Sequence, residues 1–146
     1  MSVKVTKQFN PTRQLSVDAW KFFVLHEDGT LGPLEYYFTD GMIEGPCVLL
    51  GRPMESTHGY WLFTDEQEAY RCRRDCYNTP HYILLRVQAI GLMAEGVLAD
   101  KFPCAKFQTI LIQLPEDQAP SDGALATKAA RIEVGAPLAK EHEVER

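Results

Sequence analysis

In the stretch HYILLRVQAIG, residues 81–91, every second residue is apolar, as in a strand with one buried face. This pattern constrains the fold more than any other in the sequence. One face of such an extended segment is wholly apolar and consists of Ile83, Leu85, Val87 and Ala89. The opposite face carries Tyr82, Leu84, Arg86 and Gln88. The pattern predicts a half-buried strand, which needs partner strands and a covering layer.

Further strand patterns supply those partners. They occur at 19–25, 34–38, 47–50, 59–63, 105–114 and 131–134. Asp28–Gly29 predicts a hairpin turn between the first two. The stretch LMAEGVLADKF, at 92–102, predicts two short strands that turn at Glu95–Gly96. We expect the glycine- and proline-rich residues 39–58 to form a long functional loop.

One segment has the pattern of a helix instead. Thr64 followed by Gln67 is typical of a capping box, in which each residue satisfies a backbone N–H at the helix start. The helix is predicted over about 65–76, ending before Asn78 and Pro80. Five or more strands with one principal helix predict an α+β fold, in which the helix packs on a twisted, mainly antiparallel sheet.

The expected organisation is a single α+β domain over residues 17–115. Residues 1–16 are polar and are predicted to form an N-terminal arm or a loosely attached edge. Residues 116–146 begin with a polar, then alanine-rich stretch and are predicted to be a C-terminal extension. Exposed strand edges favour a homo-oligomer.

Charge and hydropathy exclude several classes of function. The 146 residues carry a formal charge of −5, which argues against general nucleic-acid binding. No run approaches the roughly 18 apolar residues of a membrane span, and the first residues lack the apolar region of a signal peptide. We therefore expect a soluble cytoplasmic protein with no membrane partner.

Three arginines lie within four positions of the predicted helix, which makes them candidates for binding an anion. With 100° per residue, Ala69, Cys72 and Cys76 form the buried stripe. Arg71 and Arg74 fall on the far side, where Arg71 can pair with acidic residues at helical spacing. Arg73 falls at the margin of the stripe and is the best ligand-binding candidate of the three, although a core-flanking arginine fits the same position.

Aromatic residues are more numerous than the core obviously needs, so we expect some to stack on a ligand or on a neighbouring subunit. Trp20, Tyr36, Tyr37, Trp61 and Tyr82 form this group. In GYWLF, either Tyr60 and Leu62 or Trp61 and Phe63 must face the core. His58, before a glycine at a loop–strand junction, is a further ligand-binding candidate, and so is Arg86.

The four cysteines do not form a recognisable metal or catalytic motif. Cys72 and Cys76 lie one helical turn apart and His81 follows them, so Cys47, Cys104 or His58 could complete a zinc site. The spacing is atypical, and we expect reduced thiols buried in the core, with no metal, no cofactor and no cysteine nucleophile.

Four segments together resemble small bacteriophage proteins. They are WKFFVLHEDGT, YYFTDGMIEGP, GYWLFTDEQEAYRC and LLRVQAIG, which lie within about residues 19–91. The chain is most similar to the Thoeris anti-defence sponge family, which sequesters cyclic ADP-ribose-type signals made by bacterial immune enzymes. The segment after Pro115 has no counterpart in that resemblance.

The resemblance implies a non-catalytic, phage-encoded oligomer in the host cytoplasm. It would hold a cyclic nucleotide or cyclic ADP-ribose-like signal between subunits, with Arg73, Trp61 and Tyr60 as the favoured contacts. Two alternatives stay open. One is an inhibitor of a host defence protein or another bacterial protein that acts by protein contact alone. The other is an ADP-ribosyltransferase-like enzyme, which would pair His58 with Glu68 or Glu95.

Overall fold

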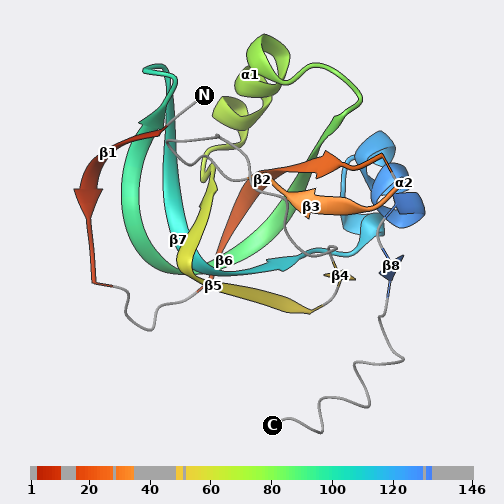
Figure 1. Ribbon diagram of the computed structural model, residues 1–146, viewed down its shortest axis with the longest axis horizontal. Helices are drawn as coiled ribbons and strands as arrows, with labels where there is room; N and C mark the ends of the chain where they lie inside the picture. Colours follow the sequence, from red (N-terminus) through yellow and green to blue (C-terminus); the bar gives the residue numbers. More distant parts are fainter. Residues whose placement is uncertain are drawn as a thin grey trace, which may run out of the picture.

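The computed structural model describes residues 3–10, 16–27, 29–34, 49–50, 52–129 and 131–132. Its main layer is a curled antiparallel sheet in the order β3-β2-β6-β7-β5, with β1 paired to the far part of β6 (Figure 1). The strands of this sheet are β1 (Val3–Gln8), β2 (Val17–Leu25), β3 (Leu31–Pro33), β5 (Pro53–Leu62), β6 (Tyr82–Leu98) and β7 (Phe102–Ile112). The predicted α+β class is confirmed.

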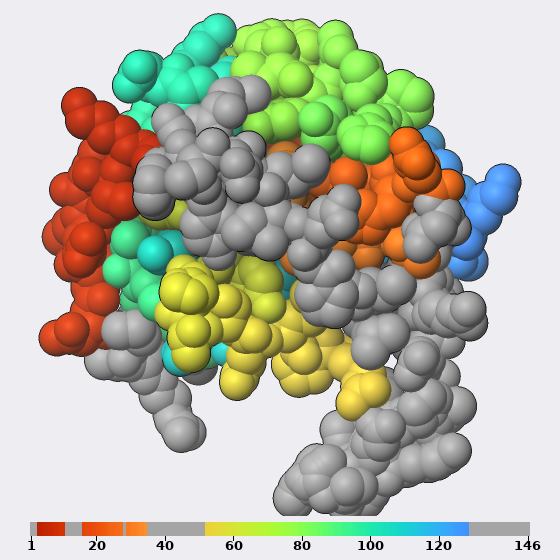
Figure 2. All heavy atoms as spheres, viewed as in Figure 1, coloured from red at the N-terminus to blue at the C-terminus, as the bar shows by residue number. Residues whose placement is uncertain are grey.

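Two helices complete the fold. Helix α1 (Glu66–Cys76) packs on the sheet at the top of Figure 1, and α2 (Pro120–Ala129) follows the short 3-10 helix η1 (Pro115–Asp117) at its side. Figure 2 shows α1 directly above the β2–β3 hairpin. None of these three helices is long and apolar enough to cross a membrane, and the described residues contain no further helix.

The sheet curls because β6 is long and bent. Its first part pairs with β2 and its far part with β1. Gly91, with φ +83°, precedes a shift of register against β7, and such bulges increase the bend of a strand. The curl brings the β5 edge back to β2, where Trp20 and Phe63 exchange two backbone hydrogen bonds of 2.8 Å.

Both faces of the curled sheet are buried, and each has its own core. The apolar face predicted for residues 83–89 lies in one core, and all four of its side chains are fully buried, as predicted. The second core lies beneath α1 and includes Phe22, Leu84 and Phe102. The neighbouring residues Phe22 and Phe23 therefore point into different cores. This explains why β2 has apolar residues on both sides.

A buried lysine joins β2 to the returning strand β5. Lys21 has no exposed surface, and its Nζ donates hydrogen bonds to the carbonyls of Leu34 at 2.9 Å and Trp61 at 2.8 Å. The same ammonium lies 5.7 Å from the centre of the Tyr60 ring. Because backbone carbonyls at the point of closure accept these bonds, Lys21 stabilises the curl.

The predicted turn at Glu95–Gly96 is wrong. Strand β6 runs through both residues, and the chain turns at Ala99 and Asp100, which have positive φ. Gly96 serves a different purpose, since a Cβ there would lie 2.6 Å from the carbonyl oxygen of Lys4. The glycine allows β1 to approach β6 closely, so the signal mistaken for a turn marks a strand contact.

The predicted helix is present, but its N-cap differs. The carboxylate of Asp65, rather than the Thr64 hydroxyl, accepts the N–H groups of Gln67 and Glu68. A carboxylate in this position also interacts favourably with the helix dipole. The predicted end at Cys76 and the full burial of Ala69 and Cys72 are confirmed.

The β2 hairpin returns earlier than predicted, at Leu31–Pro33, while residues 35–38 lie outside the described residues. Most of the loop expected at 39–58 also lies outside them, although β5 begins within it, at Pro53. The short strands β4 (Leu49–Leu50) and β8 (Arg131–Ile132) fall within the predicted segments 47–50 and 131–134 and pair in parallel.

The structure also differs from the expected boundary at residue 115. Helix α2 packs against the domain, and Ala126 belongs to the same core as the apolar face of β6. A Cβ at Gly123 would lie 2.6 Å from the carbonyl oxygen of Pro115, so η1 and α2 are in close contact. Val3–Gln8 of the predicted arm is the paired strand β1. The packed domain therefore extends beyond residues 17–115 on both sides.

Candidate functional site

A pocket of about 250 Å³ lies where α1, the β2–β6 pair and the η1–α2 connection meet. It combines two aromatic rings, a guanidinium group, two carboxylates and an amide. Its lining residues are Trp20, Glu66, Tyr70, Leu84, Arg86, Asp117, Gln118 and Ala119. A concave site of mixed aromatic and polar lining is the usual form of a small-ligand site.

The β2–β6 register provides one wall of the pocket. Trp20 and Arg86 are direct partners in the antiparallel pair, so their side chains emerge on the same face. The Nη2 of Arg86 donates to the carboxylate of Asp18 at 3.1 Å. Its Nε is buried and has no hydrogen-bond partner among the described residues. An indole and a partly paired arginine thus lie side by side.

Gln118 fixes the opposite wall. Its Oε1 accepts the backbone N–H of Arg86 at 2.7 Å, and its Nε2 donates to the carbonyls of Arg86 and Gln113 at 2.9 and 3.0 Å. The side chain therefore bonds to β6 as a neighbouring strand would. This anchor holds Asp117 and Ala119 against the pocket.

A buried ion pair connects α1 to α2 beside the pocket. The guanidinium of Arg73 binds both carboxylate oxygens of Asp122, at 2.7 and 2.9 Å. The Asp122 side chain is only 2% exposed, against 28% for Arg73. The hydrogen bond to Asp122 raises the pKa of Arg73. Arg73 is predicted as a ligand contact, but its guanidinium binds a protein carboxylate through two hydrogen bonds.

Tyr70 lies on the exposed side of α1 and lines the pocket. Its pKa is raised, first by partial burial and then by the negative charges of Asp122 and Glu66, while Arg73 opposes the shift. The phenol therefore lies in a region of net negative potential.

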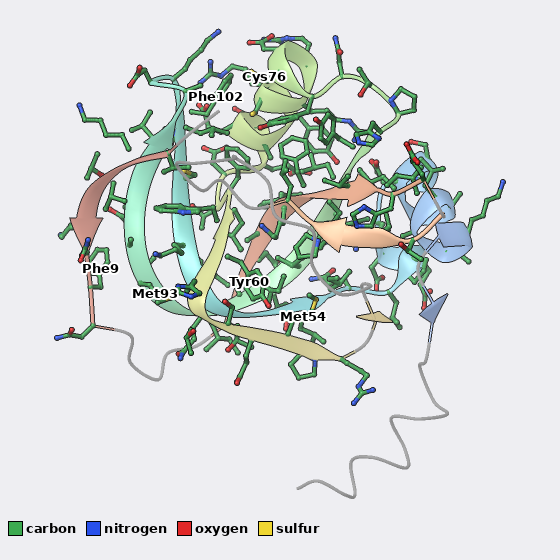
Figure 3. All side chains as sticks on the ribbon, in the orientation of Figure 1. Phe9, Met54, Tyr60, Cys76, Met93 and Phe102 are labelled. Atoms are coloured by element: carbon green, nitrogen blue, oxygen red, sulfur yellow. The ribbon has the colours of Figure 1, made fainter. Side chains whose placement is uncertain are left out.

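Tyr60 and Trp61, two further predicted contacts, are core residues. They are 8% and 7% exposed and belong to different cores, because successive residues of β5 point in opposite directions. Figure 3 places Tyr60 within the curl, far from Cys76 and Phe102 at the α1 end of the sheet. Neither lines the pocket, whereas Arg86 does.

His58 lies elsewhere, exposed on β5, with its backbone N–H bonded to the hydroxyl of Ser56. The two glutamates considered for an ADP-ribosyltransferase-like site lie on other elements: Glu68 of α1 pairs with Arg71, as the helical spacing predicted, and Glu95 is exposed on β6. No hydrogen bond or ion pair between described residues joins His58 to either of them.

Three cysteines gather between α1 and β7. Cys72 and Cys104 are buried, and burial raises the pKa of each thiol to about 12. Such thiols stay protonated at neutral pH and are poor metal ligands and nucleophiles. The described residues contain no group of three or more His, Cys, Asp or Glu side chains placed to bind a metal; Cys47 lies outside them.

Sequence patterns indicate some of the pocket-lining residues and not the others. Trp20 was among the aromatic residues expected to stack on a ligand, and Arg86 was a predicted contact. Glu66, Tyr70, Asp117 and Gln118 were not identified. Tyr70 breaks the polar face of α1 and was a usable signal, but nothing local distinguishes Asp117 or Gln118.

Comparisons with protein-family models, with curated proteins and with solved structures gave no match to this chain. The chemistry of the pocket is therefore the starting point for assigning a function.

Proposed function

We propose that the protein is a non-catalytic binding protein for a small nucleotide-type ligand, which it holds in the pocket between α1 and α2. One observation carries the proposal: Trp20, Tyr70, Arg86 and two carboxylates line the same pocket, which has a volume of about 250 Å³. Aromatic rings bind the faces of nucleobases regardless of sequence or substituent, and charged groups orient the sugar and the phosphate.

The resemblance to the Thoeris anti-defence sponge family extends this proposal. In this extended proposal, the protein is a phage-encoded oligomer that sequesters a cyclic nucleotide or cyclic ADP-ribose-like immune signal. The pocket differs from the contacts that the resemblance implied, because it uses Trp20 and Tyr70 in place of Trp61 and Tyr60. Tyr70 is 38% exposed and is therefore available to a ligand or to a second subunit.

The test is a thermal-shift screen of cyclic nucleotides and NAD-derived signals, with mass analysis of the ligand recovered after denaturation. A ligand at about 1,000 times its Kd stabilises the folded state by about 4 kcal/mol, which raises Tm by roughly 10 °C. Recovery of the intact ligand supports non-catalytic binding, and recovery of a cleaved ligand would show an enzyme.

Two variants locate the binding. Tyr70→Ala removes an exposed ring from the pocket and should abolish most of the shift. Phe9→Ala removes a ring beyond β1, away from the pocket, and should leave the shift unchanged. Absence of any shift across the screen would overturn the proposal and direct the search to a host defence protein bound by surface contact.

A further inference from the structure

The ligand groups that the pocket can bind are constrained by which of its own polar groups are still unpaired. Glu66 and Asp117 form no ion pair with any described residue. Both N–H donors of the Gln118 amide bind backbone carbonyls, and its oxygen already accepts one backbone N–H. The carboxylates of Glu66 and Asp117 therefore offer a ligand hydrogen-bond acceptors that carry negative charge.

The positive charges at and near the pocket are already opposed by protein carboxylates. The Nη2 of Arg86 donates to Asp18, and its Nε is buried. The guanidinium of the nearby Arg73 donates two hydrogen bonds to the carboxylate of Asp122. Asp18 and Asp122 oppose the positive charges of these two arginines, so a phosphate gains less from either of them than from an unpaired guanidinium.

The charge balance points the same way. Glu66 and Asp117 add two negative charges to the lining, while the positive charge of Arg86 is opposed by Asp18. The effect of carboxylates on Tyr70 indicates the same negative potential at the α1 side. A phosphate here would meet repulsion, whereas amino and hydroxyl groups would find acceptors.

The size of the pocket limits what it encloses. A volume of about 250 Å³ is below the roughly 300–1,000 Å³ of pockets that bury a drug-sized ligand. A dinucleotide or a cyclic dinucleotide would therefore leave part of its structure outside.

We propose that the pocket holds the nucleoside portion of the ligand, a flat base with an amino group and its ribose hydroxyls, and leaves the phosphates in solvent. This inference rests on the proposed function and specifies which part of the ligand the site binds. Trp20 and Tyr70 contact the base, and the carboxylates of Glu66 and Asp117 accept hydrogen bonds from amino or hydroxyl groups.

The test is a fluorescence titration with adenosine, AMP and ADP, with inosine as the analogue in which a carbonyl replaces the amino group. Trp20 supplies the signal, and Trp61 is buried away from the pocket. We expect adenosine to bind most tightly, each added phosphate to weaken binding by about three- to tenfold at low salt, and salt to reduce that difference. Inosine should bind about tenfold more weakly than adenosine.

A matched pair of charge variants isolates the acceptors. Glu66→Gln removes a carboxylate that lines the pocket, and Glu116→Gln makes the same change on an exposed residue that does not. Glu66→Gln should reduce the preference for adenosine over ADP by about threefold or more, while Glu116→Gln should leave it unchanged.

The outcomes distinguish the two proposals. Tighter binding of ADP than adenosine, lost in Arg86→Gln, would overturn the inference but support the proposed function. Equal effects of Glu66→Gln and Glu116→Gln would also overturn it. If no nucleoside or nucleotide changes the fluorescence and the wider ligand screen is also negative, both proposals fail.

Discussion

The ion pair between α1 and α2 allows a quantitative test of how Arg73 acts. Arg73→Ala would leave the carboxylate of Asp122, 2% exposed, without its cation. Removal of one partner from a fully buried pair costs about 3–5 kcal/mol. Because the Arg73 side chain is 28% exposed, water can partly replace it, and we expect a loss of about 2–3 kcal/mol.

The measurement is urea unfolding at neutral pH, followed by tryptophan fluorescence, and the expected loss corresponds to a fall in Tm of roughly 5–10 °C. Arg74→Ala is the control, because the Arg74 side chain is 71% exposed and pairs only with the adjacent Asp75 among the described residues. It should leave the urea midpoint almost unchanged.

A double-mutant cycle separates the pair from other effects. Asp122→Asn combined with Arg73→Ala should cost at least about 1 kcal/mol less than the sum of the single changes, because the second change removes the charge that the first left unpaired. If Arg73→Ala is as mild as Arg74→Ala, or if the two changes are additive, Arg73 does not hold α2 and its role as a ligand contact must be reconsidered.

Three further predictions concern buried groups. Gly96→Ala would place a Cβ 2.6 Å from the Lys4 carbonyl oxygen, so it should cost about 1–3 kcal/mol and speed hydrogen exchange in β1; unchanged exchange would contradict the close approach. Lys21→Met leaves two backbone carbonyls without their donor and should cost about 2–4 kcal/mol in urea unfolding, whereas equal or higher stability would show that the ammonium is dispensable. Burial raises the pKa of the Cys72 and Cys104 thiols from 9.0 to about 12, so between these pH values the two thiols ionise only in the unfolded chain. The urea midpoint should therefore fall as pH rises above about 9. Replacing both cysteines by serine or alanine should reduce this pH dependence.

The fold class was predictable because local patterns and tertiary structure agree over most elements. The alternating residues 81–91 form the first part of β6, and α1 starts within two residues of its predicted start at about residue 65. The wrong turn shows where a local pattern has two structural meanings. Gly96 was taken for a turn because a glycine needed for close strand approach has the same local signature as one needed for a turn.

The pocket was only partly predictable, because it depends on long-range contacts. Its lining comes from β2, α1, β6 and the η1–α2 connection, which meet only after the sheet has curled. Gln118 reaches its position through hydrogen bonds to residues 113 and 86, the second of them 32 positions away. A segment with weak helical signals was expected to extend from the domain, and its packing could not be read from composition.

The contrast between Trp61 and Trp20 shows why strand patterns alone do not separate core aromatics from aromatics that line the pocket. Trp61 lies in an unbroken apolar run, and such a run marks a strand covered on both faces, so both it and Tyr60 are enclosed. Trp20 lies between Ala19 and the buried Lys21, and its cross-strand partner is Arg86, just as the partner of Trp61 is Lys106. A cationic partner across the strands therefore does not separate the two rings. The covering of each face separates them, because Trp61 belongs to the core beneath α1, whereas Trp20 and Arg86 stay partly exposed and line the pocket.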